Sequence, residues 1–274
     1  MDSQVWLITG ASSGFGRSVA EAALVEGFTV VAAVRRPDAL GELAEKASVV
    51  ELDVTDLDAM PGVVDQVLAE HGRIDVLVNN AGRGHLGAAE ETTDDELRQL
   101  MDLHFFGPTA LTRLVLPSMR DRRSGAIVQM SSMGGRTTFP GVGAYSASKY
   151  ALEGWSEALA AELQPFGIKV LIVEPGAFRT GFNTAGAIGT STPIDAYDNQ
   201  LGPLRNRFAE ADGQQPGDPA KAAAAIISAL AQPNPPLHLP LGPDAVESIR
   251  TNLANQQAEL DAWIELSNST NVDP

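Results

Sequence analysis

A tyrosine and a lysine lie four residues apart in a segment with helical spacing, Tyr145 and Lys149. Residues four apart share one face of a helix, so both side chains point the same way. A phenol with an ordinary pKa of about 10 is a poor base at neutral pH. A neighbouring ammonium favours the phenolate and brings its pKa towards the working range. The pair therefore predicts general acid–base catalysis by Tyr145, with Lys149 as its electrostatic partner.

A serine hydroxyl precedes this pair by thirteen residues. Ser132 follows the apolar stretch 126–130, which is typical of a buried strand. Ligands bind at the carboxyl ends of parallel strands, so a hydroxyl placed there can bind a substrate oxygen. A hydroxyl that only caps the strand end explains Ser132 equally well.

A glycine-rich turn lies between the first apolar stretch, 5–8, and the first helical stretch. It reads Thr9-Gly10-Ala11-Ser12-Ser13-Gly14-Phe15-Gly16. Glycines allow a tight turn and a close approach of backbone to a pyrophosphate, which a helix N-terminus attracts through free N–H groups. The spacing differs from the common Gly-x-Gly-x-x-Gly pattern. We expect a dinucleotide site here, and an ordinary strand–helix turn is the alternative.

The end of the second apolar stretch, 28–34, bears on which dinucleotide binds. A domain that binds NAD places a carboxylate there, for the ribose 2′-hydroxyl. This chain has Val34 followed by Arg35 and Arg36. Guanidinium groups suit phosphate oxygens, so the sequence favours NADP(H) over NAD(H). In the alternative interpretation, both arginines belong to a solvated helix start before Pro37.

Alternating strand-like and helix-like stretches must position these residues. The strand-like ones are 5–8, 28–34, 49–52, 74–78, 126–130 and 169–173, and Pro240 suits 237–241 to a sheet edge. The helix-like ones are 18–26, 57–70, 94–119 and 144–163. This order predicts an α/β fold of Rossmann type, with a doubly wound parallel sheet of about seven strands and helices on both faces. We expect one domain over 1–274.

Two regions depart from this alternation. Residues 177–215 are rich in Gly, Thr, Asn and Pro, and we expect a substrate lid there rather than a plain surface loop. Residues 244–266 predict a helical tail. Its apolar side would be Ile249, Leu253, Leu260 and Ile264.

The ordered motifs make the chain resemble the compact, single-domain branch of the short-chain dehydrogenase/reductase family. The resemblance covers residues 9–180, about two thirds of the chain. Its motifs are the glycine turn, Asp53-Val54, Asn79-Asn80-Ala81-Gly82, Ser131-Ser132, Tyr145-x3-Lys149, and Pro175-Gly176 with Thr180. Each motif alone is weak, but all of them in this order are highly specific.

The resemblance implies a role for each matching residue. Tyr145 would be the general acid/base, Lys149 would lower its pKa and hold the nicotinamide ribose, and Ser132 would polarise the substrate oxygen. Thr180 would bind the nicotinamide carboxamide. Tyr145 and Lys149 also count among the expected cofactor-binding residues. The resemblance implies that the remaining cofactor contacts come from Gly10, Ser12, Ser13, Gly14, Phe15, Gly16, Asp53, Val54, Asn80, Ala81, Gly82, Pro175 and Gly176, and the arginine argument above adds Arg35.

One position departs from the family. An asparagine that supports a proton path in the family aligns with His104. An imidazole can donate, accept and relay protons near neutral pH, so we expect His104 to replace that asparagine. A packed core histidine is the alternative. The other three histidines lack ligand-like spacing, and we expect no metal.

Charge and composition exclude several classes of protein. With 19 basic and 35 acidic residues the net charge is −16, which opposes binding to nucleic acid or to an anionic membrane surface. There are 0 cysteines, which removes disulfides and thiolate chemistry. With no apolar run of about 20 residues and no secretory signal, we expect a cytoplasmic protein. Family members often pair through two long helices, here 94–119 and 144–163, so a homodimer or homotetramer is expected.

These observations predict an NADP(H)-dependent oxidoreductase that interconverts a carbonyl and an alcohol. Phe139, Val142, Phe178 and Phe182 favour a hydrophobic small-molecule substrate. The alternative is a non-catalytic regulator that senses NADP(H), for which a degraded Tyr/Lys/Ser set would be expected. Sugar epimerisation and enoyl reduction stay open, although those relatives carry a larger C-terminal domain or a wider Tyr–Lys spacing.

Overall fold

The Val- and Ile-rich stretches form parallel strands that are covered on both faces. The computed structural model describes residues 3–182, 188–211 and 213–272, in which seven strands build the main sheet. Each strand is parallel to its neighbours. The order across the sheet is β3 (Ser48–Glu51), β2 (Thr29–Val34), β1 (Val5–Thr9), β4 (Val76–Asn79), β6 (Gly125–Met130), β7 (Ile168–Pro175) and β9 (His238–Leu241).

The strand order reverses direction beside β1. The chain runs from β1 through β2 to β3 at one edge, and then returns to β4 on the other side of β1. Ligands of open α/β sheets bind at such a reversal, outside the carboxyl ends of the strands. The predicted fold class is confirmed, and β9 with Pro240 lies at the edge as expected.

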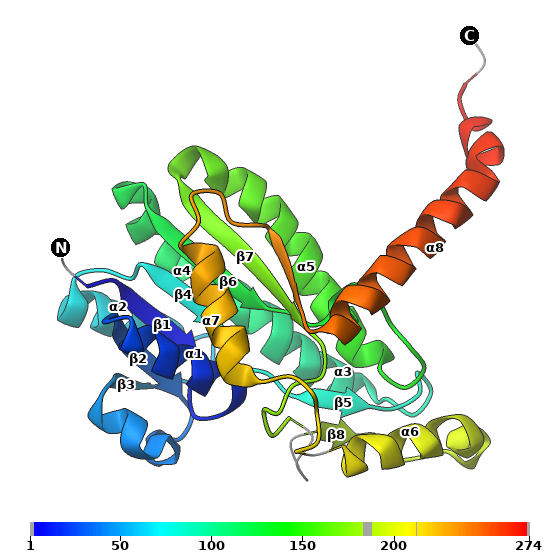
Figure 1. Cartoon of the computed structure of the whole chain (residues 1–274), viewed down its shortest axis with the longest axis horizontal. Coiled ribbons are helices and arrows are strands. Elements are labelled where there is room, and N and C mark those ends of the chain that lie inside the picture. Colours follow the sequence, from blue (N-terminus) through cyan, green and yellow to red (C-terminus); the bar gives the residue numbers. More distant parts are fainter. Residues whose placement is uncertain (1–2, 183–187, 212, 273–274) are drawn as a thin grey trace.

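Helices cover the two faces of the sheet (Figure 1). One face packs against α1 and α7, through residues such as Val19, Ala23 and Ile226. The other packs against α2, α4 and α5. The helices are α1 (Gly14–Val25), α2 (Met60–His71), α3 (Asp94–Met101), α4 (Gly107–Arg122), α5 (Gly143–Leu163), α6 (Asp198–Glu210), α7 (Pro219–Leu230) and α8 (Pro243–Asn268).

The single helix expected over 94–119 is divided, which corrects that prediction. α3 ends at Met101, a π-helical turn spans Asp102–Phe106, and α4 begins at Gly107. Pro108 has no N–H to donate to the carbonyl of residue 104, so the regular α-helical ladder is interrupted there. A side chain on Gly107 would collide with the Val54 carbonyl. The break therefore lets the helix approach the end of β3, and it places His104 inside the irregular turn.

The region expected to be a loop-like lid contains regular structure. Within 177–215 lie β8 (Ile188–Thr190) and α6, while residues 183–187 and 212 fall outside the described part of the chain. β8 pairs in parallel with β5 (Gly84–Leu86), a second small sheet that the sequence analysis did not anticipate. Strands of three residues are too short to show an alternating pattern. Helix α7, an alanine-rich segment over Pro219–Leu230, is also absent from the predicted elements.

The C-terminal helix is longer than predicted and projects from the body of the protein (Figure 1). Only Ile249 of its expected apolar side is buried, at 6% exposure. Leu253, Leu260 and Ile264 are each about half exposed. Among the described helices, none combines the length and the apolar character needed to span a membrane.

Candidate active site

A cavity of about 1100 Å³ opens at the carboxyl edge of the sheet, where the strand order reverses. Every residue that the sequence analysis assigned to catalysis or cofactor binding lines it, apart from Gly16. These are Gly10, Ser12, Ser13, Gly14, Phe15, Arg35, Asp53, Val54, Asn80, Ala81, Gly82, His104, Ser132, Tyr145, Lys149, Pro175, Gly176 and Thr180. The fold thus gathers motifs spread over 171 positions, from 10 to 180, around one space.

The first two turns of α5 carry the tyrosine and the lysine. Lys149 is buried, and its Nζ donates a hydrogen bond of 2.8 Å to the Met130 carbonyl at the end of β6. Burial lowers the pKa of Lys149 to about 8, although the charge of Glu153 opposes that effect. The ammonium lies 5.9 Å from the centre of the Tyr145 ring. Lys149 is therefore a cation that gives up its proton far more readily than an exposed lysine.

The Tyr145 phenol stays protonated in the chain by itself. Burial raises its pKa above the ordinary value, and the neighbouring Ser132 hydroxyl only partly offsets this. From the sequence, Lys149 is expected to lower the pKa of Tyr145. In the structure burial outweighs that attraction, because a charged phenolate loses more hydration than the distant ammonium restores.

Ser132 faces Tyr145 across a glycine. A methyl group added to Gly134 would lie 3.3 Å from Ser132 Oγ and 3.2 Å from Tyr145 Cε1. Ser132 Oγ accepts a hydrogen bond of 3.0 Å from the Gly134 N–H, so the serine does cap a turn. Its own proton remains available to donate, because a hydroxyl is both donor and acceptor. The capping and the substrate-binding interpretations are therefore compatible.

His104 packs edge-on against the Tyr145 ring, with ring centres 5.5 Å apart. Its Nε2 accepts a hydrogen bond of 3.1 Å from the Arg83 N–H, which assigns the ring proton to Nδ1. Nδ1 lies 2.8 Å from Ser148 Oγ, and that hydroxyl donates to the Tyr145 carbonyl. Burial, with the charges of Lys149 and Arg83, holds the pKa of His104 well below its ordinary value. The imidazole is therefore neutral, with a partner at each nitrogen.

The glycine turn is shaped so that no side chain fits in it. Gly10 and Gly14 have φ of 66° and 54°, a region that glycine adopts without strain. A Cβ on Gly16 would collide with Asn80 Nδ2 and with the Gly10 carbonyl. Asn80 Nδ2 also donates to the Thr9 carbonyl at 2.9 Å and holds the turn against β4. Since α1 starts at Gly14, its unpaired first-turn N–H groups belong to this turn.

The comparison with known families decides the identity. A family model described as short chain dehydrogenase matches residues 4–187, about two thirds of the sequence. The chain belongs to the short-chain dehydrogenase family. It is thus an oxidoreductase of a family that uses a nicotinamide cofactor.

Individual short-chain dehydrogenases resemble the whole chain. A crystal structure from Streptomyces avermitilis is 52% identical, has a TM-score of 0.93, and covers 99% of this chain and 100% of its own. A 3-ketodihydrosphingosine reductase from Bacteroides thetaiotaomicron is 42% identical over 245 residues, 89% of each chain. A short chain dehydrogenase from Burkholderia cenocepacia, in complex with NADP, is 25% identical with a TM-score of 0.75, over 95% and 97% of the two chains.

The glycine turn of this short-chain dehydrogenase fits the pyrophosphate of a nicotinamide dinucleotide. Gly10 and Gly14 line the cavity without side chains, so a bound phosphate can approach their backbone closely, and the absence of a side chain at Gly16 lets α1 pack against Gly10. Thr180 lies against the turn, since a methyl group on Gly14 would lie 3.0 Å from the Thr180 carbonyl. Further along the cavity, the Asp53 carboxylate accepts two hydrogen bonds from Thr55. These bonds and Arg35 outweigh burial and hold the pKa of Asp53 below its ordinary value.

Both arginines after β2 line the same cavity and are exposed. Within the described residues neither Arg35 nor Arg36 forms an ion pair or a side-chain hydrogen bond. Arg35 faces Asp53 closely enough for its charge to lower the pKa of that carboxyl. Two guanidinium groups are therefore available at this end of the cavity.

Several residues of the cavity wall escaped the sequence analysis. β5 supplies His85 and Leu86, and α6 supplies Phe208. Neither element carries a signature motif, so only their tertiary placement reveals these residues. By contrast Phe139, Val142, Phe178 and Phe182, which were expected near the mouth, do line the cavity.

A buried glutamate ties the α6 region to the body of this short-chain dehydrogenase. Glu91 Oε2 accepts a hydrogen bond of 2.6 Å from Arg205 on α6 and one of 2.7 Å from the Ala88 N–H. Its Oε1 accepts from the Ile194 N–H at 2.9 Å. Burial alone would raise the pKa of Glu91, but these bonds and the guanidinium lower it. The segment before α6 and α6 itself are thereby fastened over one end of the cavity.

Proposed function

We propose that the protein is an NADP(H)-dependent oxidoreductase that interconverts a carbonyl and an alcohol on a hydrophobic small molecule. One observation carries the proposal: Ser132 and Tyr145 meet at Gly134, with Lys149 on the same wall of the cavity that holds the glycine turn. An intact set of this kind favours turnover over the binding-only role of a regulator.

In the direction of reduction, Ser132 donates its proton as a hydrogen bond to the carbonyl oxygen of the substrate. Tyr145 then gives its phenolic proton to the same oxygen, which becomes the alcohol. The raised pKa of Tyr145 keeps that proton in place until the oxygen gains charge. Lys149 stabilises the phenolate left behind. When bound, the reduced nicotinamide supplies the hydride.

The preference for NADP(H) is supported by Arg35 and Arg36. Their guanidinium groups line the cavity and have no carboxylate partner among the described side chains. Val34 stands where a carboxylate would bind a ribose 2′-hydroxyl. The relative from Burkholderia cenocepacia, solved with NADP, is consistent with this choice.

A hydrophobic substrate is supported by the aromatic and aliphatic part of the wall. Phe139, Val142, Phe182 and Phe208 come from the loop before α5, from the α6 region and from α6 itself. The Tyr145 ring is 6.2 Å from the Phe182 ring, so the apolar wall adjoins the acid/base. The relative from Bacteroides thetaiotaomicron is named as the reductase of a 3-keto compound, which fits a carbonyl substrate.

We include residues 177–215 in the proposal as a lid over the substrate end of the cavity. α6 supplies Phe208 to the wall, and the Glu91–Arg205 contact fastens the helix. One domain over 1–274 contains both the sheet and this lid. A homodimer or homotetramer through the outer faces of α4 and α5, and a cytoplasmic location, complete the proposal.

Cofactor binding tests the proposal first. We expect purified protein to bind NADPH at least tenfold more tightly than NADH, about 1.4 kcal/mol, in a titration that follows nicotinamide fluorescence. Equal affinities would place the arginines outside the 2′-phosphate site. Absence of binding by either cofactor would contradict the enzyme assignment itself.

The role of His104 is tested by comparing two substitutions. His104→Asn, which introduces the amide that the family resemblance implies at this position, is expected to keep most of the turnover, whereas His104→Ala is expected to lower it roughly tenfold or more. A relay function requires that one of the contacts to Arg83 or Ser148 opens during turnover, because both nitrogens are engaged. The measurement is the pH profile of kcat for both variants. An unchanged profile in His104→Ala would show that the ring only fills space.

A further inference from the structure

One face of α5 carries an ionisable side chain every fourth residue. Tyr145 and Lys149 belong to the candidate site, and Glu153 and Glu157 continue the same line. Glu153 is buried, at 3% exposure, whereas the Glu157 side chain is about half exposed. The line therefore runs from the candidate acid/base, past a buried carboxyl group, to the surface. The proposed mechanism leaves Glu153 unused.

The carboxyl group of Glu153 lies one helical turn beyond Lys149, and a second carboxyl group, that of Glu174, is among its neighbours. Among the described residues, neither of its oxygens has a hydrogen bond of good geometry, and the same holds for Glu174 Oε2 on β7. Two carboxylates that face each other form a hydrogen bond only when one of them holds a proton. Burial and, to a lesser extent, the charge of Glu174 raise the pKa of Glu153 to about 8, although the Ser131 hydroxyl and the Arg136 guanidinium oppose them. A proton shared by the two glutamates satisfies both.

Gly135 and Ser131 link this pair to the lysine. A methyl group on Gly135 would lie 2.9 Å from Glu153 Oε1 and 2.7 Å from Ser131 Oγ, so both polar atoms border the same small space. Ser131 directly follows Met130, whose carbonyl binds the Lys149 ammonium. The charge of Glu153 raises the pKa of Lys149, in opposition to burial.

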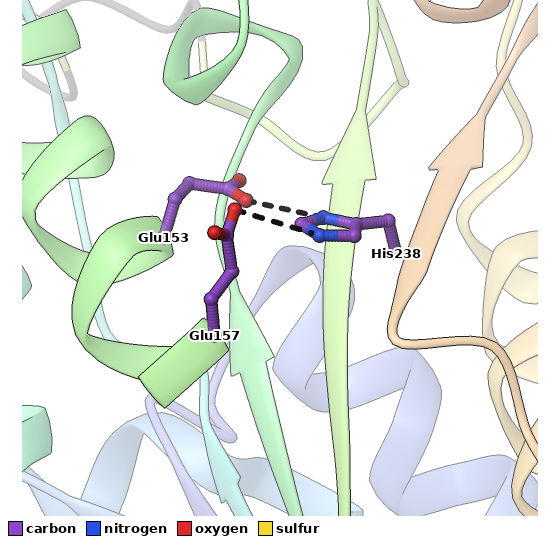
Figure 2. A group of neighbouring side chains, drawn as sticks. All are labelled: Glu153, Glu157 and His238. Atoms are coloured by element: carbon purple, nitrogen blue, oxygen red, sulfur yellow. Dashed lines mark ion pairs between the residues drawn. The ribbon is translucent and has the colours of Figure 1, made fainter. Parts of the chain in front are cut away.

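His238 lies between the buried Glu153 and the more exposed Glu157 (Figure 2). Its Nδ1 is 2.7 Å from Glu174 Oε1 and 3.4 Å from Glu153 Oε2. Its Nε2 lies 3.6 Å from the exposed Glu157. The Arg136 guanidinium, 2.9 Å from Glu174 Oε1, adds a cation. The imidazole, about a quarter exposed, thus lies between the two buried carboxyl groups and the more exposed Glu157.

This arrangement favours proton exchange over metal binding. Glu153, Glu157 and His238 each present one ligand atom within 4.8 Å of the others. A single ion can use only one of the two ring nitrogens, whereas the two carboxylates face different nitrogens in Figure 2. The Arg136 guanidinium, 2.9 Å from Nδ1, would also repel a metal cation.

We propose that Glu153, Glu174 and His238 form a positioning cluster that sets the charge state of Lys149. When the glutamate pair loses its shared proton to solvent through His238, the added negative charge stabilises the lysine ammonium. The remaining groups that face Glu153 are Glu157 and Tyr150 from α5, and Ser131 and Arg136 from the segment after β6. The kinetic consequence rests on the proposed function, because it assumes that Lys149 acts with Tyr145. The effect on the lysine itself does not.

The charge of Lys149 is directly measurable, since the chain has only four lysines. In protein labelled with ¹³Cε-lysine, NMR gives four signals, and loss of one in Lys149→Met assigns it. Glu153→Gln is expected to lower the titration midpoint of Lys149 by at least about half a pH unit, because a nearby negative charge is removed. Glu162→Gln, an exposed change of equal charge on the same helix, is the control and should leave the midpoint in place.

An unchanged midpoint in Glu153→Gln, or an equal shift in Glu162→Gln, would overturn the proposal. If Glu153→Gln does not fold, His238→Asn replaces it in the experiment, since His238 lies on the edge strand β9. The ring contacts both carboxyl groups through Nδ1, and loss of this contact should destabilise the deprotonated pair. The pair should then keep its proton to higher pH, so the Lys149 midpoint should again fall. An unchanged midpoint there would likewise contradict the cluster.

Kinetics then separate the cluster from the proposed function. In Glu153→Gln the alkaline limb of the kcat profile should move to lower pH, with NADPH affinity below that limb unchanged. If the Lys149 midpoint shifted but neither the unsubstituted protein nor Glu153→Gln reduced a carbonyl, the proposed function would be contradicted and the cluster would be supported. If Glu153→Gln turned over the substrate with an unchanged Lys149 midpoint and an unchanged alkaline limb of the kcat profile, the cluster would be contradicted and the proposed function would stand.

Discussion

Tyr145→Phe is expected to lower the rate of carbonyl reduction by about 10²- to 10⁴-fold, the range that a positioned general acid contributes. The substitution removes only the phenolic oxygen, and the ring can still pack against His104 and Phe182. The assay follows consumption of NADPH with a panel of aromatic and long-chain aliphatic ketones and aldehydes. Binding of NADPH, measured by fluorescence, should change little. The phenolic oxygen that is removed takes part in proton transfer, whereas the glycine turn provides the proposed binding site for the cofactor.

Tyr150→Phe is the matched control for this experiment. Tyr150 lies five residues further along α5 and is 41% exposed, so its hydroxyl should not matter for turnover. If Tyr145→Phe kept full turnover, the acid/base assignment would be wrong. If it also preserved the cellular role of the protein while Arg35→Ala abolished that role, the regulator alternative would replace the enzyme.

Arg35→Ala is expected to weaken NADPH binding by about 10- to 100-fold and to leave NADH binding nearly unchanged. A hydrogen bond to a charged group contributes about 1.5–3 kcal/mol, and only NADPH carries the 2′-phosphate that would accept it. The measurement is the same fluorescence titration, carried out with both cofactors. Because Arg35 is exposed and has no carboxylate partner among the described residues, its removal should not disturb the fold.

Arg120→Ala serves as the control for the change in overall charge. Arg120 is exposed near the end of α4 and does not line the cavity. If Arg35→Ala weakened the binding of NADPH and NADH equally, the side chain would support the cavity without contacting the 2′-phosphate. If Arg35→Ala had no effect, Arg36→Ala would identify whether the second guanidinium carries the contact.

Local patterns in the sequence predict the sheet well. Six of the seven main strands are continuous Val- and Ile-rich stretches, which is typical of parallel strands buried on both faces. The proline in β9 marks the edge. Alternation of these stretches with helices leaves the doubly wound topology as the natural solution, since crossovers are right-handed and short. Elements with weak local signals, such as β5 and α7, were not anticipated.

The candidate site was also largely predictable, for a related reason. Its residues lie at strand ends and in the first turns of helices, and parallel strands bring their carboxyl ends to one edge. Motifs as distant as Gly10 and Thr180 therefore line the same cavity. The spacing of Tyr145 and Lys149 follows from helix geometry alone.

Tertiary packing decided what local patterns do not encode. The break at Gly107 and Pro108 depends on the close approach to Val54, and it gives His104 its two partners. The raised pKa of Tyr145 and the lowered pKa of Lys149 arise from burial, which depends on elements folded around α5.

The sequence by itself thus determined the fold class, the family and the candidate catalytic and cofactor-binding residues, because these depend on periodicity and on motifs at strand ends. Only the tertiary structure placed Glu153 beside Glu174 and His238, from helix α5 and from two strands far apart in the chain. Such contacts join residues with no common local pattern. The electrostatic surroundings of Lys149 follow from them, since desolvation and neighbouring charge act through space rather than along the chain.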